Sequence, residues 1–153
     1  MSYLSPAGIQ VANGNMSSIA NAATTAVQLI AAPGAGLMYI VHGVFLNVKV
    51  GTVTWTGVGN AWLVYGTTGN DTVNLASTFI TNQIQTMSAS TNYACFGPVS
   101  IGGDWLGSTQ GQTQKVLSSA TINKAIGFTC SNAVLTGNGT IDWKLWYSII
   151  QAA

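Results

Sequence analysis

The chain has 153 residues, enough for one domain with its own hydrophobic core. Apolar residues make up 48% of the chain, but charged residues make up only 5% and the formal net charge is +1, whereas a typical soluble domain has about 25% charged residues. A free monomer usually stays soluble through surface charge. Amides and hydroxyls, by contrast, cost less than ions to bury between subunits. The composition therefore favours a subunit of a larger assembly.

The small set of ionisable side chains also excludes several functions. It has no Arg or Glu and consists of Lys49, Lys115, Lys124, Lys144, Asp71, Asp104, Asp142 and His42. Four lysines cannot form a phosphate-binding stripe, so we expect no nucleic-acid ligand. One histidine with two distant cysteines matches no metal-ligand spacing, and no nucleophile or phosphate-loop motif is present. We therefore expect no enzymatic activity, no catalytic residues, no metal and no cofactor.

The individual polar residues have structural explanations. His42 lies within an apolar strand pattern, where a hydrogen-bonded structural histidine is expected. Asp71 and Asp142 are interpreted as turn or capping residues. Cys95 and Cys130 are interpreted as buried thiols, with a disulfide between them as the alternative.

Residues 1–25 differ in composition from the rest and show no sustained strand or helix period. We interpret them as an extended N-terminal arm, ordered against a neighbouring subunit or simply frayed. The opening residues have neither the basic nor the apolar region of a secretion signal. The longest apolar stretch is too short for a membrane-spanning helix. We therefore expect no membrane partner.

Residues 26–153 are predicted to form one β-sandwich or jelly-roll domain of about eight strands. A bend or bulge is expected near His42 and Gly43. The sequence from Thr136 to Thr140 has the composition of a hairpin turn. The expected strands cover 27–31, 37–50, 53–56, 61–65, 92–96, 116–121, 124–130 and 141–150, with one short helix at 75–82.

The last strand has two different faces. One face is wholly apolar and is predicted to be core: Ile141, Trp143, Leu145, Tyr147 and Ile149. The other face is mixed and suits a surface or a subunit contact. Among the remaining tryptophans, Trp55 and Trp62 are predicted to fill the core, whereas Trp105 and Trp146 are candidate contacts. The candidate inter-subunit contacts are thus Tyr3, Leu4, Ile9, Trp105 and Trp146.

Three segments of the C-terminal third, NKAIGFTCSN, AVLTGNGT and IDWKLWYSII, together with the earlier turn AAPGAG, resemble small bacteriophage virion proteins. The resemblance covers residues 27–150, and the virion proteins concerned are capsid decoration (cement) proteins, head fibres and tail components. It implies a trimeric β-sandwich or jelly-roll module and transfers no functional residue.

Composition and resemblance together predict a non-enzymatic virion protein that is assembled in the host cytoplasm. The expected form is a decoration or cement subunit that acts as a homo-oligomer, with a trimer favoured, on the major capsid protein or other virion proteins. The alternative is a tail or fibre component that binds host glycans, for which Trp105 beside Asp104 is the local candidate.

Overall fold

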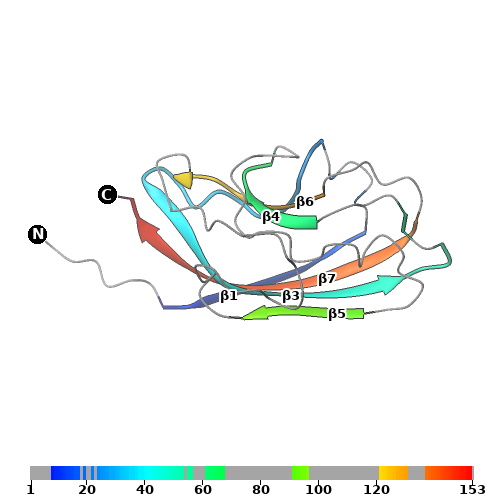
Figure 1. The fold of residues 1–153 in the computed structure, drawn as a ribbon. Coiled ribbons are helices and arrows are strands. Elements are labelled where there is room, and N and C mark those ends of the chain that lie inside the picture. Colours follow the sequence, from blue (N-terminus) through cyan, green and yellow to red (C-terminus); the bar gives the residue numbers. More distant parts are fainter. Residues whose placement is uncertain are drawn as a thin grey trace, which may run out of the picture.

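A computed structural model describes residues 8–17, 19, 22, 24–53, 55–56, 61–67, 91–96, 121–130 and 137–152. These residues form an all-β sandwich, as predicted, with two antiparallel sheets in separate layers (Figure 1). The described strands are β1 (Gln10–Met16), β2 (Val27–Ile30), β3 (Leu37–Val50), β4 (Ala61–Tyr65), β5 (Thr91–Phe96), β6 (Ile126–Cys130) and β7 (Gly139–Gln151). No helix in this part of the chain is long and apolar enough to cross a membrane.

The four-stranded sheet has the order β1-β7-β3-β5, and the three-stranded sheet has the order β2-β6-β4. The long strands β3 and β7 pair over almost their whole length and form the centre of the larger sheet. The predicted bounds of β3 and β4 are correct, and those of β2, β5, β6 and β7 differ by one or two residues at an end.

The core lies between the two sheets, where alternate residues of each strand point inward. On β7, Ile141, Trp143 and Leu145 are buried, and Tyr147 and Ile149 pack against the same cluster, so the predicted core face is confirmed. The other sheet contributes mainly Leu63, Tyr65, Ile126, Phe128 and Cys130.

The tryptophan and cysteine predictions are confirmed where the structure tests them. Trp55 and Trp143 are buried in the core, and Cys130 is fully buried on β6. The side chains of Trp62 and Cys95 lie outside the described residues.

The expectation that residues 1–25 contain no strand is wrong for Gln10–Met16. These residues form β1, which pairs with β7 in an unbroken antiparallel register from Gln10 opposite Tyr147 to Met16 opposite Ile141. Met16 and Ile19 are buried in the core. The sequence signal was weak because the inward positions of β1 include Ala12 and Gly14, which add little hydrophobicity to the alternation.

Gly14 has a specific packing role on this strand. A Cβ placed there would lie 2.7 Å from Cζ2 of Trp143, which is closer than van der Waals contact. A glycine therefore allows β1 to lie directly against the indole ring.

The predicted strand at 53–56 is not formed by its described residues Val53, Trp55 and Thr56, of which only Thr56 makes a single β-bridge. After β3, the chain folds around Asn138: the amide of Gly51 donates to the Asn138 carbonyl at 2.8 Å, and the amide of Val53 donates to Asn138 Oδ1 at 2.8 Å. Trp55 then turns into the core beside Gly137, where a side chain would collide with the indole. Hydrogen bonds to Asn138 replace those of a strand ladder.

The turn expected around residues 136–140 does not join β6 and β7 as paired strands, and the other arm expected for this hairpin, 132–135, lies outside the described residues. Strand β6 belongs to the three-stranded sheet, whereas β7 lies in the other sheet with β1 and β3 on its two sides. The connection between them therefore crosses from one sheet to the other. The expected helix at 75–82 and nearly all of the expected strand at 116–121 lie outside the described residues.

Candidate interaction surface on the four-stranded sheet

The four-stranded sheet has an outer face, which we define as its side away from the core. On β1 and β7 this face consists of alternate residues, and the register continues it onto β3. Its members include Val11, Asn13, Asn15, Asp142, Lys144, Trp146, Ser148, Phe45, Asn47 and Lys49. It is the mixed face that the sequence predicts for the last strand.

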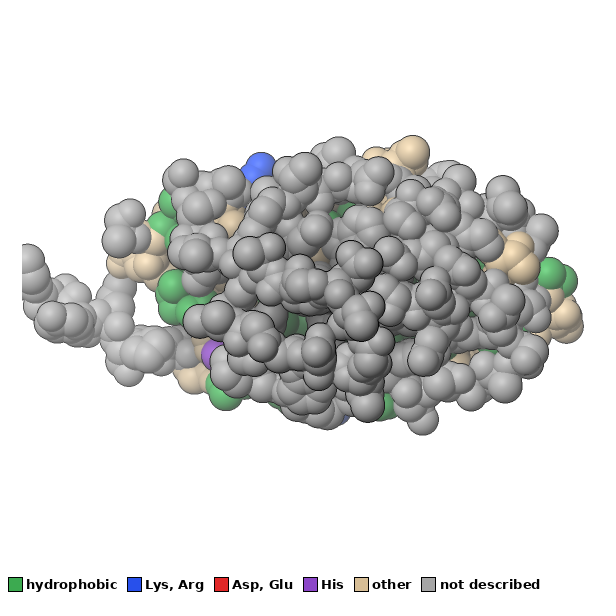
Figure 2. Space-filling model, viewed as in Figure 1, with side chains coloured by type: hydrophobic (Ala, Val, Ile, Leu, Met, Phe, Trp, Pro, Cys, Tyr) green, Lys and Arg blue, Asp and Glu red, His purple; other side chains and the backbone are tan. Residues whose placement is uncertain are grey.

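Most described ionic groups lie on this outer face. Lys49, Asp142 and Lys144 are on it, and Lys124 lies in the segment before β6. On the face shown in Figure 2, the described atoms that reach the surface belong mainly to hydrophobic side chains, uncharged polar side chains and backbone. Among the described residues, Lys124 is the charged side chain that lies outside the group on β3 and β7.

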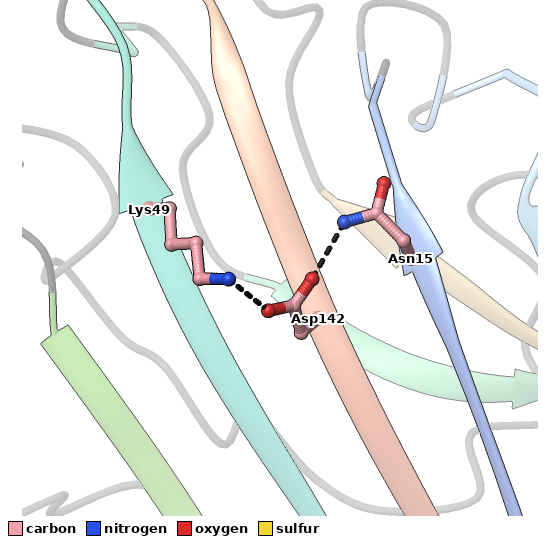
Figure 3. Close-up of polar contacts among 3 residues, drawn as sticks. All are labelled: Asn15, Lys49 and Asp142. Atoms are coloured by element: carbon pink, nitrogen blue, oxygen red, sulfur yellow. Dashed lines mark hydrogen bonds and ion pairs between the residues drawn. The ribbon is translucent and has the colours of Figure 1, made fainter.

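Asp142 links three neighbouring strands (Figure 3). Its carboxylate lies 2.5 Å from Nζ of Lys49 on β3, and Nδ2 of Asn15 on β1 donates to its other oxygen at 2.6 Å. The hydrogen bond from Lys49, followed by that from Asn15, holds the pKa of Asp142 below its usual value. The turn or capping role expected for Asp142 is wrong, because the residue lies within β7 and bridges both adjacent strands.

His42 occupies the bulge predicted near the middle of β3. The register with β7 shifts between Val41 and Gly43, which leaves His42 as the extra residue. Its Nε2 lies 2.8 Å from Oγ of the buried Ser148. The prediction of a hydrogen-bonded structural histidine is therefore confirmed.

Trp146 lies between β1 and β3, opposite Val11 on one side and the side-chain-free Gly43 on the other. Its side chain is half-buried, and Nζ of Lys144 lies 5.7 Å from the ring centroid, within the range of a cation–π contact. Such an amphipathic aromatic surface suits a subunit contact.

The other predicted contacts are only partly described. Ile9, which precedes β1, is 63% exposed, and it is separated by one residue from Val11, which is opposite Trp146. The structure thus brings Ile9 and Trp146 to the same edge region. Tyr3, Leu4 and Trp105 lie outside the described residues.

Sequence reasoning missed Val11, Asn15 and Lys49 as members of this surface. Their grouping depends on β1 lying beside β7, and no local pattern indicates that pairing. The alternation of Ile9 and Val11 was the one available signal.

The described ionisable side chains on this face are engaged with their neighbours. Among the described residues, no group of three or more His, Cys, Asp or Glu side chains is placed to hold a metal ion. Asp142 is held as an ion pair with Lys49, and His42 is used in the contact with Ser148. The arrangement is suited to holding strands and presenting a surface.

No protein-family model and no curated protein matches the chain. A search of solved structures finds similarity to a chain of the cyanophage Pam1 capsid asymmetric unit, with a TM-score of 0.47 and 15% sequence identity. The similar region covers 97% of this chain and 89% of that chain.

Proposed function

We propose that the protein is a non-enzymatic structural subunit of a bacteriophage particle, and specifically a capsid decoration (cement) protein. It acts as a homo-oligomer, with a trimer as the expected form, bound to the major capsid protein. The observation that carries this proposal is the near absence of charge, seen both in the composition and on the described strands. A subunit whose surface is largely covered by neighbouring subunits needs few charged side chains to stay soluble, and each charged side chain would be costly to bury.

The mechanism is mechanical. The two sheets enclose a core of closely packed side chains, and a close-packed interior has low compressibility, so the domain resists deformation. Its outer face combines amides, a half-buried indole and a small ion-paired group, which is a composition typical of protein interfaces. A standard interface buries about 1,600 Å² in total. Copies bound across the seams between capsomers would add such area and resist the outward pressure of packaged DNA.

The experiment compares phage heads assembled with and without this chain. Heads that lack it should still assemble and package DNA, but should release the DNA at a lower temperature than complete heads. Purified protein added back to the deficient heads should restore the release temperature. Equal release temperatures for the two kinds of head would contradict the cement role.

The N-terminal residues are tested in the same assay. Deleting residues 1–20 would remove β1 and the buried Met16. A loss of particle binding by that variant could therefore result from misfolding alone. Deleting residues 1–7 leaves β1 intact and removes the predicted contacts Tyr3 and Leu4. If these residues form an arm over a neighbour, the shortened protein should fold normally and bind deficient heads more weakly. Unchanged binding would remove the arm from the mechanism.

A further inference from the structure

Charged residues are distributed unequally between central and edge strands. Within the described strands, the charged side chains are Lys49 on β3 and Asp142 and Lys144 on β7, and both strands are central in the larger sheet. The strands at the described edges of the two sheets, β1, β5, β2 and β4, carry none. Soluble monomers usually protect sheet edges with lysines, prolines or bulges, because an open edge pairs with other chains. Here β1 has a regular register and lacks all three devices.

Exposed apolar side chains gather at the same edge. Three large hydrophobic residues in the described part of the chain are exposed: Ile9 at 63%, Val11 at 49% and Val53 at 47%. Two of them lie at the start of β1, and Val11 stands opposite the half-buried Trp146. The β1 edge therefore offers a neutral strand with an apolar patch beside it.

The directions of the strands indicate how such an edge can be covered. Strand β1 is antiparallel to β7, β7 to β3, and β3 to β5, so β1 and β5 run in opposite directions at the two described edges of one sheet. Rotating a second copy about an axis along the strands would bring its β5 beside β1 in antiparallel orientation. Head-to-tail contacts of this kind form a closed ring when the rotation between copies is a whole fraction of a turn, and an open filament when it is not.

We propose that β1 of one copy pairs with β5 of the next copy, and that three copies close into a ring through this joint. The inference rests on the homo-oligomer of the proposed function and names its interface. A second copy is favoured as the occupant because an uncharged edge meets another uncharged edge without repulsion, whereas a basic or acidic partner would find no charge to pair with. A twofold pairing of β1 with itself would use only one of the two edges of the described four-stranded sheet, whereas the head-to-tail joint uses both.

The test is the mass of the purified protein in solution, measured by light scattering. The wild type should have three times the chain mass of 15.8 kDa. Val11→Lys places a charge at the β1 edge, at a side chain already half exposed, and should reduce the mass to that of one chain while the circular dichroism spectrum is unchanged. Val53→Lys is the matched control, since Val53 has nearly the same exposure but lies beyond the end of β3. It should retain the three-chain mass.

A second variant separates the head-to-tail joint from the twofold pairing. Asn92→Lys charges β5 at the position opposite Asn47 and should also yield single chains. Mixed in equal amounts, the β1 variant and the β5 variant have one intact edge each, so they should form a species of two chains and stop.

A two-chain wild type that is sensitive to Val11→Lys and insensitive to Asn92→Lys would overturn the joint in favour of twofold pairing. A monomeric wild type that is nevertheless present in phage heads would overturn the joint and leave the virion role intact. A three-chain ring that is absent from heads would overturn the virion role and leave the joint intact.

Discussion

Replacing Gly14 by alanine tests whether β1 is an integral part of the fold. The added Cβ would lie 2.7, 2.9 and 3.0 Å from three atoms of the Trp143 indole. The ring is itself buried in the core and has little room to move. Overpacking of this kind costs about 1–3 kcal/mol, and a domain of this size loses about 2–4 °C of melting temperature for each kcal/mol. We therefore expect Gly14→Ala to lower the melting temperature by several degrees.

The assay is thermal and urea unfolding of the purified protein, with Gly8→Ala as the matched control. A Cβ at Gly8 meets no atom within 4 Å, so this variant should change stability by less than about 0.5 kcal/mol. Combining Gly14→Ala with Trp143→Leu should cost less than the sum of the two single changes, because the smaller side chain relieves the collision. If Gly14→Ala had no effect on the isolated protein, β1 would not be docked against Trp143 in solution.

Three further predictions concern the core and two titrating groups. Leu145→Ala removes a fully buried side chain and should cost about 2–5 kcal/mol in urea unfolding; the exposed Gln28→Ala should be nearly neutral, and equal effects would contradict the assigned core. Burial raises the pKa of Tyr65 well above the usual 10.0, so stability should fall as the pH rises above about 10, where only the unfolded chain ionises. Tyr65→Phe removes a 2.7 Å hydrogen bond to the Tyr39 carbonyl and should cost about 1–3 kcal/mol at pH 7. The stability of this variant should fall less steeply at alkaline pH than that of the wild type, and an equal slope would refute the raised pKa of Tyr65. Because the pKa of Asp142 is lowered in the folded protein, its carboxylate should stabilise the fold above the unfolded pKa of 3.8, and this stabilisation should disappear as the pH falls through the folded pKa. The melting temperatures of the wild type and of Asp142→Asn should therefore converge in acid. A difference in melting temperature that does not depend on pH would count against the ion pair.

The long strands were predictable because their side chains repeat the alternation that a half-buried strand requires. The faces of β7 follow directly from this period, with Ile141 and Leu145 buried and Lys144 exposed. The bulge at His42 was indicated by a polar residue and a glycine in an apolar strand.

The failures arose where distant contacts override local pattern. The inward face of β1 includes Gly14, which allows the strand to pack closely against the indole of Trp143, more than 100 positions away in sequence. The segment at 53–56 has strand-forming residues, but Asn138 supplies hydrogen bonds that divert the chain. The Asn138-Gly139 pair was interpreted as part of a hairpin turn, because sequence shows the turn chemistry and not which sheet receives the next strand.

The sequence predicts the outer face as the mixed face of one strand and not as a surface that extends over three strands. It indicates Trp146 and Ile9 as contacts only from the apolar or aromatic character of their side chains. The triad of Asn15, Asp142 and Lys49 joins three strands, and its members become neighbours only once the order β1-β7-β3 is known.

The proposed role as a component of a phage shell is tested most simply by the copy number of the protein in purified particles. Heads and tails of a phage whose genome carries this sequence would be separated and analysed by quantitative mass spectrometry against the major capsid protein. A decoration protein should stay with the heads at a fixed ratio to the capsid protein. Absence from the particles would contradict the virion role, and recovery with the tails alone would contradict the decoration role and favour the tail or fibre alternative.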